Sequence, residues 1–339
     1  MGKTIAVIGV MGAAGREILG VLSDRGIPVT DIVALGAGDG PGREASYGED
    51  DVLKVGEAET FDFSTCAVAI LAVPPAAAAK LAPKIAAAGC VAVDTSPAFR
   101  LEQGVPLVVP DVNRQALVNW TKKHIVACPS AMTALIAMAL RPLDDAYGLI
   151  RVIATTYQST AGTGRDGMDE LFRQTRGIYV NESPTSSKDI FTKQIAFNVI
   201  PHVDDFLKDG ATAQEEGIAA ESRKIFSPDL EVHANCARVP VFVGSAAYLN
   251  LQFEGQVTAE QARTLLKDAP GVTVVDHRAD EGYVSPVECT GEDLVYVSRV
   301  RSDSTVENGL SLWVVADDLR IGAINAADVA LSLVEARQK

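Results

Sequence analysis

The stretch KTIAVIGVMGAAGREILGVLSDRG, residues 3–26, decides the fold of the first part of the chain. It begins with a β-branched run that predicts a strand, passes through a glycine-rich turn, and continues with the apolar periodicity of a helix. Glycines in such a turn let the backbone approach a pyrophosphate closely, and the helix N-terminus then supplies N–H groups and a positive dipole. The predicted cofactor loop comprises Gly9, Met11, Gly12, Ala13, Ala14 and Gly15.

The alternation of strands and helices continues through the first third of the chain. A second helix is predicted at residues 76–89. Strands that alternate with helices indicate a parallel sheet with helices on both faces, the doubly wound nucleotide-binding architecture. We therefore expect a Rossmann-like dinucleotide-binding domain over residues 1–129. Its further strands are predicted at residues 29–36, 68–74, 91–96, 106–112 and 124–128.

The pattern changes after about residue 130, where longer strands show alternating polarity. Such alternation favours an antiparallel or mixed sheet with one covered face. We expect an α+β domain over residues 130–318, followed by a terminal helix over residues 319–339. The strands of this second domain are predicted at residues 149–159, 231–254, 293–302 and 309–318, and its helices at 213–226 and 258–269.

Composition excludes several classes of protein. The 339 residues are 47% hydrophobic and carry a formal net charge of −14, which argues against nucleic-acid and anionic-membrane partners. No apolar run reaches the roughly 20 residues of a membrane span. Five scattered cysteines without a CxxC pair suit a reduced cytoplasm, and the four histidines show no metal-ligand spacing. We expect a cytoplasmic protein without a metal site.

Asp39 bears on the choice of cofactor. It follows the second predicted strand in ALGAGDGPG, residues 34–42. A carboxylate there accepts hydrogen bonds from a ribose 2′-hydroxyl and repels a 2′-phosphate, so NAD is favoured over NADP. The alternative interpretation is that Asp39 only begins a solvated turn and that the glycine loop only packs tightly.

Six motifs spread over the chain carry a resemblance to a known family. They are IAVIGVMGAAGREIL (5–19), FRLEQGVPLVVPDVN (99–113), YQSTAGTG (157–164), QIAFNVIPHVDDF (194–206), RVPVFVGSAAYLNLQFE (238–254) and NGLSLWVVADDLRIGAINAADVA (308–330). Together they resemble the aspartate-semialdehyde dehydrogenases, and most of all their divergent Usg-like paralogues. The resemblance implies a Rossmann-like domain, a catalytic and dimerisation domain, a homodimer, and a terminal helix that packs on the first domain.

The resemblance also implies a chemistry. In the family, a cysteine thiolate attacks the aldehyde, hydride passes to NADP, phosphate cleaves the thioester, and a histidine acts as acid and base. Matched residue by residue, the nucleophile position is Ala131 in CPSAMT, residues 128–133. The histidine position, seven residues after Arg238, is Ser245, and the phosphate-binding lysine and its partner glutamate become Gly217 and Gln214.

The family residues that persist are the glycine loop and three polar side chains. Arg100, Gln158 and Arg238 are candidates for binding a small-molecule substrate, since guanidinium groups fit carboxylates and phosphates. Their alternative role is structural, in salt bridges or in bracing a turn. Cys128 could be a relocated nucleophile, but burial as a small apolar side chain is favoured.

Three functions remain open. The favoured hypothesis is a family member that has lost its NAD(P)-dependent, phosphorylating semialdehyde dehydrogenase activity and binds a nucleotide or a small acid. The second is an oxidoreductase that acts on an aldehyde by a changed mechanism. The third is a true aspartate-semialdehyde dehydrogenase with an altered nucleophile.

Overall fold

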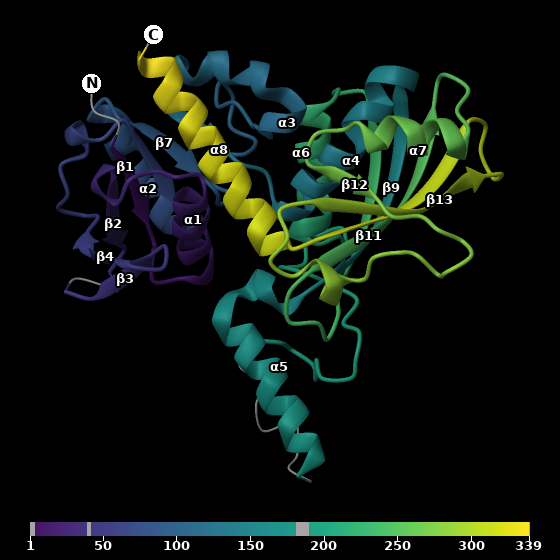
Figure 1. The fold of residues 1–339 in the computed structure, drawn as a ribbon, viewed down its shortest axis with the longest axis horizontal. Coiled ribbons are helices and arrows are strands. Elements are labelled where there is room, and N and C mark those ends of the chain that lie inside the picture. Colours follow the sequence, from purple (N-terminus) through teal and green to yellow (C-terminus); the bar gives the residue numbers. More distant parts are fainter. Residues whose placement is uncertain (1–3, 39–41, 181–189, 339) are drawn as a thin grey trace. The chain divides into compact units, whose positions relative to one another are not determined.

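The computed structural model describes residues 4–38, 42–180 and 190–338 (Figure 1). The chain forms two compact units. The N-terminal unit comprises Met1–Ser130 together with Gly322–Lys339, and the C-terminal unit comprises Ala131–Ile321. Asp39, the predicted ribose contact, lies outside the described residues.

A six-stranded parallel sheet forms the centre of the N-terminal unit, in the order β5-β2-β1-β6-β7-β8. The strand β1 is buried along its whole length, as expected for a parallel strand covered on both faces. The predicted fold class is confirmed for this unit. Its strands are β1 (Ile5–Ile8), β2 (Ile32–Gly36), β5 (Gly56–Glu57), β6 (Val68–Leu71), β7 (Val91–Asp94) and β8 (Ile125–Ala127). Its two longest helices before residue 130 are α1 (Ala13–Asp24) and α2 (Pro75–Ala87).

The last helix, α8 (Asp318–Gln338), contributes its residues from Gly322 onward to the N-terminal unit. Its small apolar side chains, among them Ala327 and Ala330, join the buried cluster around α1 and β1. Polar contacts also hold the helix in this unit, since the Asn325 side-chain amide donates to the Val108 carbonyl at 3.0 Å.

The predicted strand at residues 106–112 is wrong. Only an isolated bridge joins Leu107 to Ala127, and the chain then turns into the short helix α3 (Pro110–Asn113) and a 3₁₀ helix over Arg114–Lys122. The Asn113 side chain ends the extended run. Its Oδ1 accepts the Val109 N–H at 2.9 Å, and its Nδ2 donates to the Leu107 carbonyl at 2.9 Å. Neither backbone group is therefore available to pair with a neighbouring strand.

The segment after β2 forms a two-stranded antiparallel hairpin of β3 (Glu44–Tyr47) and β4 (Asp51–Lys54).

The strand predicted at residues 29–36 begins later than expected. Residues 29–31 form a 3₁₀ turn after Pro28, whose extended backbone ends the preceding segment, and β2 starts only at Ile32.

A mixed six-stranded sheet forms the centre of the C-terminal unit, in the order β10-β9-β11-β14-β13-β12. The outer pairs β10/β9 and β12/β13 are parallel and the inner pairs are antiparallel, so the predicted mixed sheet is confirmed. Helices α4 (Ala131–Tyr147), α6 (Ala213–Ile225) and α7 (Ala259–Lys267) pack on one face. The strands are β9 (Leu149–Gln158), β10 (Glu231–Arg238), β11 (Ser245–Phe253), β12 (Val272–Val274), β13 (Val295–Asp303) and β14 (Gly309–Ala316).

The single strand predicted over residues 231–254 is two strands in different places of the sheet. Pro240 interrupts the run, and the chain reverses at Gly244, which has φ +94°. A Cβ at Gly244 would lie 2.4 Å from the Pro286 carbonyl oxygen, so only glycine fits. The sequence analysis also missed α5 (Gly164–Tyr179), whose apolar residues are few.

None of the helices in the described ranges is both long enough and apolar enough to cross a membrane.

Gly15 and Gly20 of α1 predict opposite effects of alanine on stability. A Cβ at Gly15 would lie 2.2 Å from the Gly9 carbonyl oxygen, a backbone atom, whereas a Cβ at Gly20 meets nothing within 4 Å. We expect Gly15→Ala to lower the free energy of unfolding by about 2 kcal/mol through overpacking. Gly20→Ala should raise it by up to ~1 kcal/mol through helix propensity. Urea unfolding measures both, and equal effects of the two variants would contradict the tight turn.

Candidate active site and cofactor loop

The glycine loop after β1 is shaped by backbone contacts that exclude side chains. Gly9 has φ +89°, and a Cβ there would lie 2.2 Å from the Ala72 carbonyl oxygen. Its N–H donates to the Leu35 carbonyl at 2.8 Å, and Gly12 closes the turn by donating to the Gly9 carbonyl at 3.0 Å. The helix α1 then begins without a side-chain cap and without an acidic residue in its first turn. Such a helix N-terminus fits a pyrophosphate group.

An acidic side chain that the sequence analysis missed lies at the carboxyl end of β2. Glu57 ends the two-residue strand β5, where it stands beside Gly36. Its Oε1 accepts the N–H of Gly38 at 3.4 Å. The pairing of β5 with β2 spans some twenty residues and a hairpin, so no local pattern in the sequence predicts it. Glu57 adds negative charge where a ribose 2′-substituent lies in this type of fold.

Cys128 and Arg100 lie together in the N-terminal unit. The Arg100 Nε donates to the Cys128 carbonyl at 3.0 Å, and its Nη2 donates to the Thr95 carbonyl at 2.8 Å. Cys128 is 2% exposed, and burial, with a smaller effect of the Asp94 carboxylate, raises the pKa of its thiol to about 12. Because attack on a carbonyl requires a thiolate, this thiol is not suited to act as a nucleophile at neutral pH.

Ala131 is the first residue of α4. A helix N-terminus is the position at which a thiolate or an oxyanion gains stability from the helix dipole. The side chain that this helix presents there is a methyl group, which has no electron pair to share with a carbonyl carbon.

Gln158 and Arg238 are neighbours at the ends of β9 and β10, where the two strands pair them in register. Arg238 is 5% exposed, and its Nη1 donates to the Ser159 carbonyl at 2.6 Å. Burial lowers the pKa of its guanidinium, an effect that Asp204 and Asp318 oppose. A Cβ at Gly162 would lie 3.0 Å from the Arg238 Nη1, so the adjoining turn is fitted to this side chain.

Gln158 has a local partner, since its Nε2 donates to the Thr156 Oγ1 at 3.1 Å. This contact orients the amide along β9. Arg238 differs, because no carboxylate in the described part of the chain forms an ion pair with it. Asp204 and Asp318 act on this buried cation from beyond ion-pair distance, so no carboxylate is bound to the guanidinium, which suits a site that takes an anionic ligand.

Ser245 begins β11 and is fully buried, with an exposed fraction of 0%. Its Oγ accepts the Ser159 N–H at 2.9 Å and forms a side-chain hydrogen bond with Asp318. The Ser159 hydroxyl donates to the Asp318 Oδ1 at 3.1 Å. The three side chains form one network, hereafter the Asp318 network, in which the Ser245 hydroxyl serves the fold.

Asp318 is 8% exposed, and burial raises the pKa of its carboxyl, while the hydrogen bonds from Ser245 and Ser159 act in the opposite direction. Sequence reasoning missed both Ser159 and Asp318. A serine at the end of a strand and an aspartate at the start of a helix are common in proteins and give no functional signal by themselves. Only the sheet order β9-β11-β14 brings the two side chains together.

The positions matched to the family's phosphate lysine and its glutamate lie on α6. Gly217 has no side chain, and Gln214 is half-buried in the first turn. Glu215 between them is engaged structurally. It forms a capping box with Thr212, and its Oε1 accepts the Cys236 N–H at 2.9 Å.

Comparison with known proteins gives the class to which this fold belongs. Residues 4–120 match the family described as "Semialdehyde dehydrogenase, NAD binding domain", and residues 140–321 match "Semialdehyde dehydrogenase, dimerisation domain". The N-terminal unit is therefore of the nicotinamide-nucleotide-binding type.

Relatives narrow the class to one family. Aspartate-semialdehyde dehydrogenase of Rickettsia bellii is 39% identical over 332 residues, 98% of this chain and 97% of the relative, and that of Aquifex aeolicus is 37% identical over 99% of both. The crystal structure of aspartate-semialdehyde dehydrogenase II from Vibrio cholerae, complexed with ASA, superposes with a TM-score of 0.94 at 35% identity over 99% of both chains. This chain belongs to the aspartate-semialdehyde dehydrogenase family.

The raised pKa of Asp318 predicts how stability depends on pH. A carboxyl with a raised pKa stabilises the fold below its ordinary pKa of about 4 and loses this contribution as pH rises through the folded-state value. Asp318→Asn cannot ionise. The free energy of unfolding of the variant, minus that of the parent, should therefore become more positive between pH 4 and pH 7 in urea unfolding.

Asp303 supplies a control of opposite sign. Hydrogen bonds from Thr305, and a smaller one from Asn250, lower its pKa, so its ionised form stabilises the fold. For Asp303→Asn the same difference should become more negative as pH rises. If the free-energy difference between variant and parent changed with pH in the same direction for both variants, the raised pKa of Asp318 would be contradicted.

Proposed function

We propose that this chain binds a nicotinamide dinucleotide and a small carboxylic acid, and that it does not perform the covalent, phosphate-dependent oxidation of an aldehyde. One observation carries the proposal. The Ser245 hydroxyl, which matches the position of the family's acid and base, is buried and hydrogen-bonded to the Ser159 N–H and to Asp318. Ala131, which matches the position of the nucleophile, has no side-chain group that can attack a carbonyl. The missing nucleophile resembles the Usg-like paralogues, although these commonly keep the histidine that Ser245 replaces here.

The balance of the reaction supports the same conclusion. Phosphorylating oxidation needs a nucleophile that forms a bond to the aldehyde carbon, a base that takes its proton, and a cation that holds phosphate. The three matched positions are Ala131, Ser245 and Gly217. Since an acyl intermediate has no atom to form on, the loss abolishes the route instead of slowing it.

Binding of a small acid rests on Arg238. Its guanidinium is buried and is held by the Ser159 carbonyl. A planar guanidinium can bind a carboxylate with two parallel hydrogen bonds, and Gln158, paired with it in register, adds an amide. Arg100 donates to two backbone carbonyls, so its proposed role in binding is secondary.

The cofactor loop fits a dinucleotide whose pyrophosphate lies on the N-terminus of α1. When bound, a nicotinamide dinucleotide supplies a hydride acceptor. Gly9, Gly12 and Gly15 bring the backbone close, and the first turn of α1 provides N–H donors. Glu57, together with Asp39, favours NAD over NADP because carboxylates repel a 2′-phosphate.

We also propose a cytoplasmic homodimer. The sheet of the C-terminal unit has one face covered by helices, and its other face carries half-buried aromatic rings. Trp313 lies 4.9 Å from Tyr248 and 5.9 Å from Tyr157 between ring centroids. Aromatic side chains of this kind are enriched at protein interfaces, and this unit matches the dimerisation domain of the family.

The catalytic part of the proposal predicts the outcome of a series of reversions. Ala131→Cys alone and Ser245→His alone should give no phosphate-dependent reduction of NAD or NADP with L-aspartate 4-semialdehyde, because base, nucleophile and phosphate cation act as one unit. The triple variant Ala131→Cys, Ser245→His, Gly217→Lys should give a measurable rate by absorbance of the reduced cofactor.

The matched control carries Ala134→Cys in place of Ala131→Cys, together with Ser245→His and Gly217→Lys, and should stay inactive because its thiol lies elsewhere on α4. Activity of Ala131→Cys by itself would indicate an ordinary dehydrogenase with an altered nucleophile. Reduction of NAD by the unchanged chain with an aldehyde, in the absence of phosphate, would indicate the changed mechanism.

The cofactor part predicts a preference that calorimetric titration measures. We expect NAD to bind more tightly than NADP. Glu57→Gln should reduce the ratio of the NADP dissociation constant to the NAD dissociation constant about fivefold. The reason is that the variant removes one negative charge that repels the 2′-phosphate at a solvent-screened surface. Glu59→Gln, two residues away and exposed, is the control and should leave the ratio unchanged. Binding of neither nucleotide would refute the cofactor proposal.

A further inference from the structure

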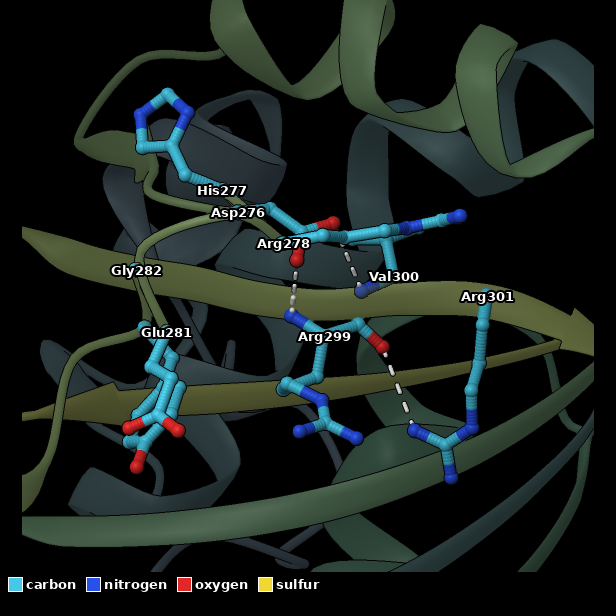
Figure 2. A pocket seen from close by; sticks show the side chains of 9 residues that line it. Asp276, His277, Arg278, Glu281, Gly282, Arg299, Val300 and Arg301 are labelled. Atoms are coloured by element: carbon cyan, nitrogen blue, oxygen red, sulfur yellow. Dashed lines mark hydrogen bonds between the residues drawn. The ribbon is translucent and has the colours of Figure 1, made fainter.

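A pocket of about 500 Å³ lies in the C-terminal unit between the 276–283 loop and β13. Its walls include three arginines, Arg278, Arg299 and Arg301, beside two carboxylates, Asp276 and Glu281. Figure 2 shows Arg299 and Arg301 leaving β13 toward the same side, while Arg278 extends from the loop. Such a gathering of cations is unexpected in a chain with a formal net charge of −14.

None of the three arginines forms an ion pair with a carboxylate in the described ranges, and the one carboxylate outside the pocket that interacts with them electrostatically is Asp303, whose pKa Arg301 helps to lower. Asp276 is already neutralised by Arg263 of α7, at 2.6 Å, in a largely buried ion pair. Its two oxygens also accept the N–H groups of Arg299 at 2.9 Å and Val300 at 3.2 Å (Figure 2). The carboxylate therefore fixes the wall of the pocket and does not compensate the charge of the arginines.

The backbone holds the arginines in place. A β-bulge interrupts the β13/β14 pairing between Ser298 and Arg301, and Arg299 within it has φ +56°. Bulges of this kind re-aim side chains and recur beside functional sites, and a non-glycine residue at positive φ stores strain. Arg301 lies over the Tyr248 ring at 5.7 Å and donates to the Arg299 carbonyl at 3.4 Å.

The loop that forms the opposite wall is also closed by the backbone. His277 and Gly282 exchange two hydrogen bonds, at 3.0 and 2.8 Å. A Cβ at Gly282 would lie 2.7 Å from the His277 Cβ, so the loop closes this tightly only with glycine. The pocket thus combines a defined shape with an excess of positive charge.

We propose that this pocket binds a small polyanion, a molecule that carries two or more phosphate or carboxylate groups. A volume of about 500 Å³ exceeds one phosphate ion and suits a metabolite with separated anionic groups. Arg299 and Arg301 would hold one group and Arg278 a second, because guanidinium forks match both chemistries. None of its residues belongs to the glycine loop or the Asp318 network, whereas Arg301 packs on Tyr248 of the proposed dimer face, so the test below also follows the dimer.

The test compares two double variants of the full chain by calorimetric titration with pyrophosphate and with citrate. Arg278→Gln, Arg299→Gln removes two pocket cations, and Arg165→Gln, Arg176→Gln removes two exposed cations of α5 with the same change in net charge. We expect the pocket variant to bind one of the probes at least about tenfold more weakly than the parent, while the α5 variant binds as the parent does. The glycine loop is unchanged in both, so any phosphate bound there cancels in the comparison.

Arg278→Lys, Arg299→Lys keeps the charge and should retain part of the affinity, which guards against a folding defect in the glutamine variant. Equal affinities of the parent and the pocket variant for both probes would overturn the proposal, as would a parent that binds neither probe. Unchanged affinities with a loss of dimer in sedimentation would also overturn it, because the arginines would then serve a subunit interface.

Discussion

The buried Asp318 carboxyl is the constraint on which the rest of the site depends. It lies at the start of α8, two residues beyond the end of β14, and receives hydrogen bonds from Ser159 after the end of β9 and from Ser245 at the start of β11. The Ser159 carbonyl in turn receives the Arg238 guanidinium from the end of β10. One carboxyl thus ties together the ends of four strands and places the only buried guanidinium among the candidate residues.

In the proposed function, Ser245 stands at the position of the acid and base, and this network shows that the serine has a structural role there. A serine at position 245 does not leave an empty space, because its hydroxyl completes the hydrogen bonding of Ser159 and Asp318. A buried polar network is favourable only when its members are satisfied. A histidine at this position would have to replace the Ser245 hydrogen bonds, whereas the contact of Arg238 with the Ser159 carbonyl does not involve Ser245.

The two units show different degrees of change from the family pattern. The glycine loop keeps the geometry that a dinucleotide requires, with Gly9 and Gly15 excluding side chains. The C-terminal unit has its mixed sheet and Arg238, whereas Ala131 and Gly217 carry no reactive group and the Ser245 hydroxyl is held by hydrogen bonds. This difference between the two units is the basis of the proposed function, in which the chain binds its ligands without acyl transfer.

Local patterns in the sequence predicted the parallel sheet, the mixed sheet and the glycine turn, because strand period, helix period and turn glycines are short-range signals. They failed where a distant partner decides the structure. Residues 106–112 have the pattern of a strand, but the Asn113 side chain forms hydrogen bonds with the Val109 N–H and the Leu107 carbonyl. Residues 231–254 read as one strand, although Pro240 and the close approach of Gly244 to Pro286 divide it.

The candidate site shows the same division between short-range signals and distant partners. Arg238 and Gln158 were predicted from motif resemblance, whereas Ser159, Asp318 and Glu57 depend on sheet order and had no local signal. Whether the predicted site residues act on a ligand stays a prediction.

One measurement tests the central claim most directly. The unchanged chain is incubated with L-aspartate 4-semialdehyde, phosphate and either NAD or NADP, and acyl phosphate and reduced cofactor are quantified together. The account predicts neither product above the level of a reaction without protein. Stoichiometric formation of both would contradict it, because it would require a nucleophile that Ala131 and the buried Ser245 do not provide.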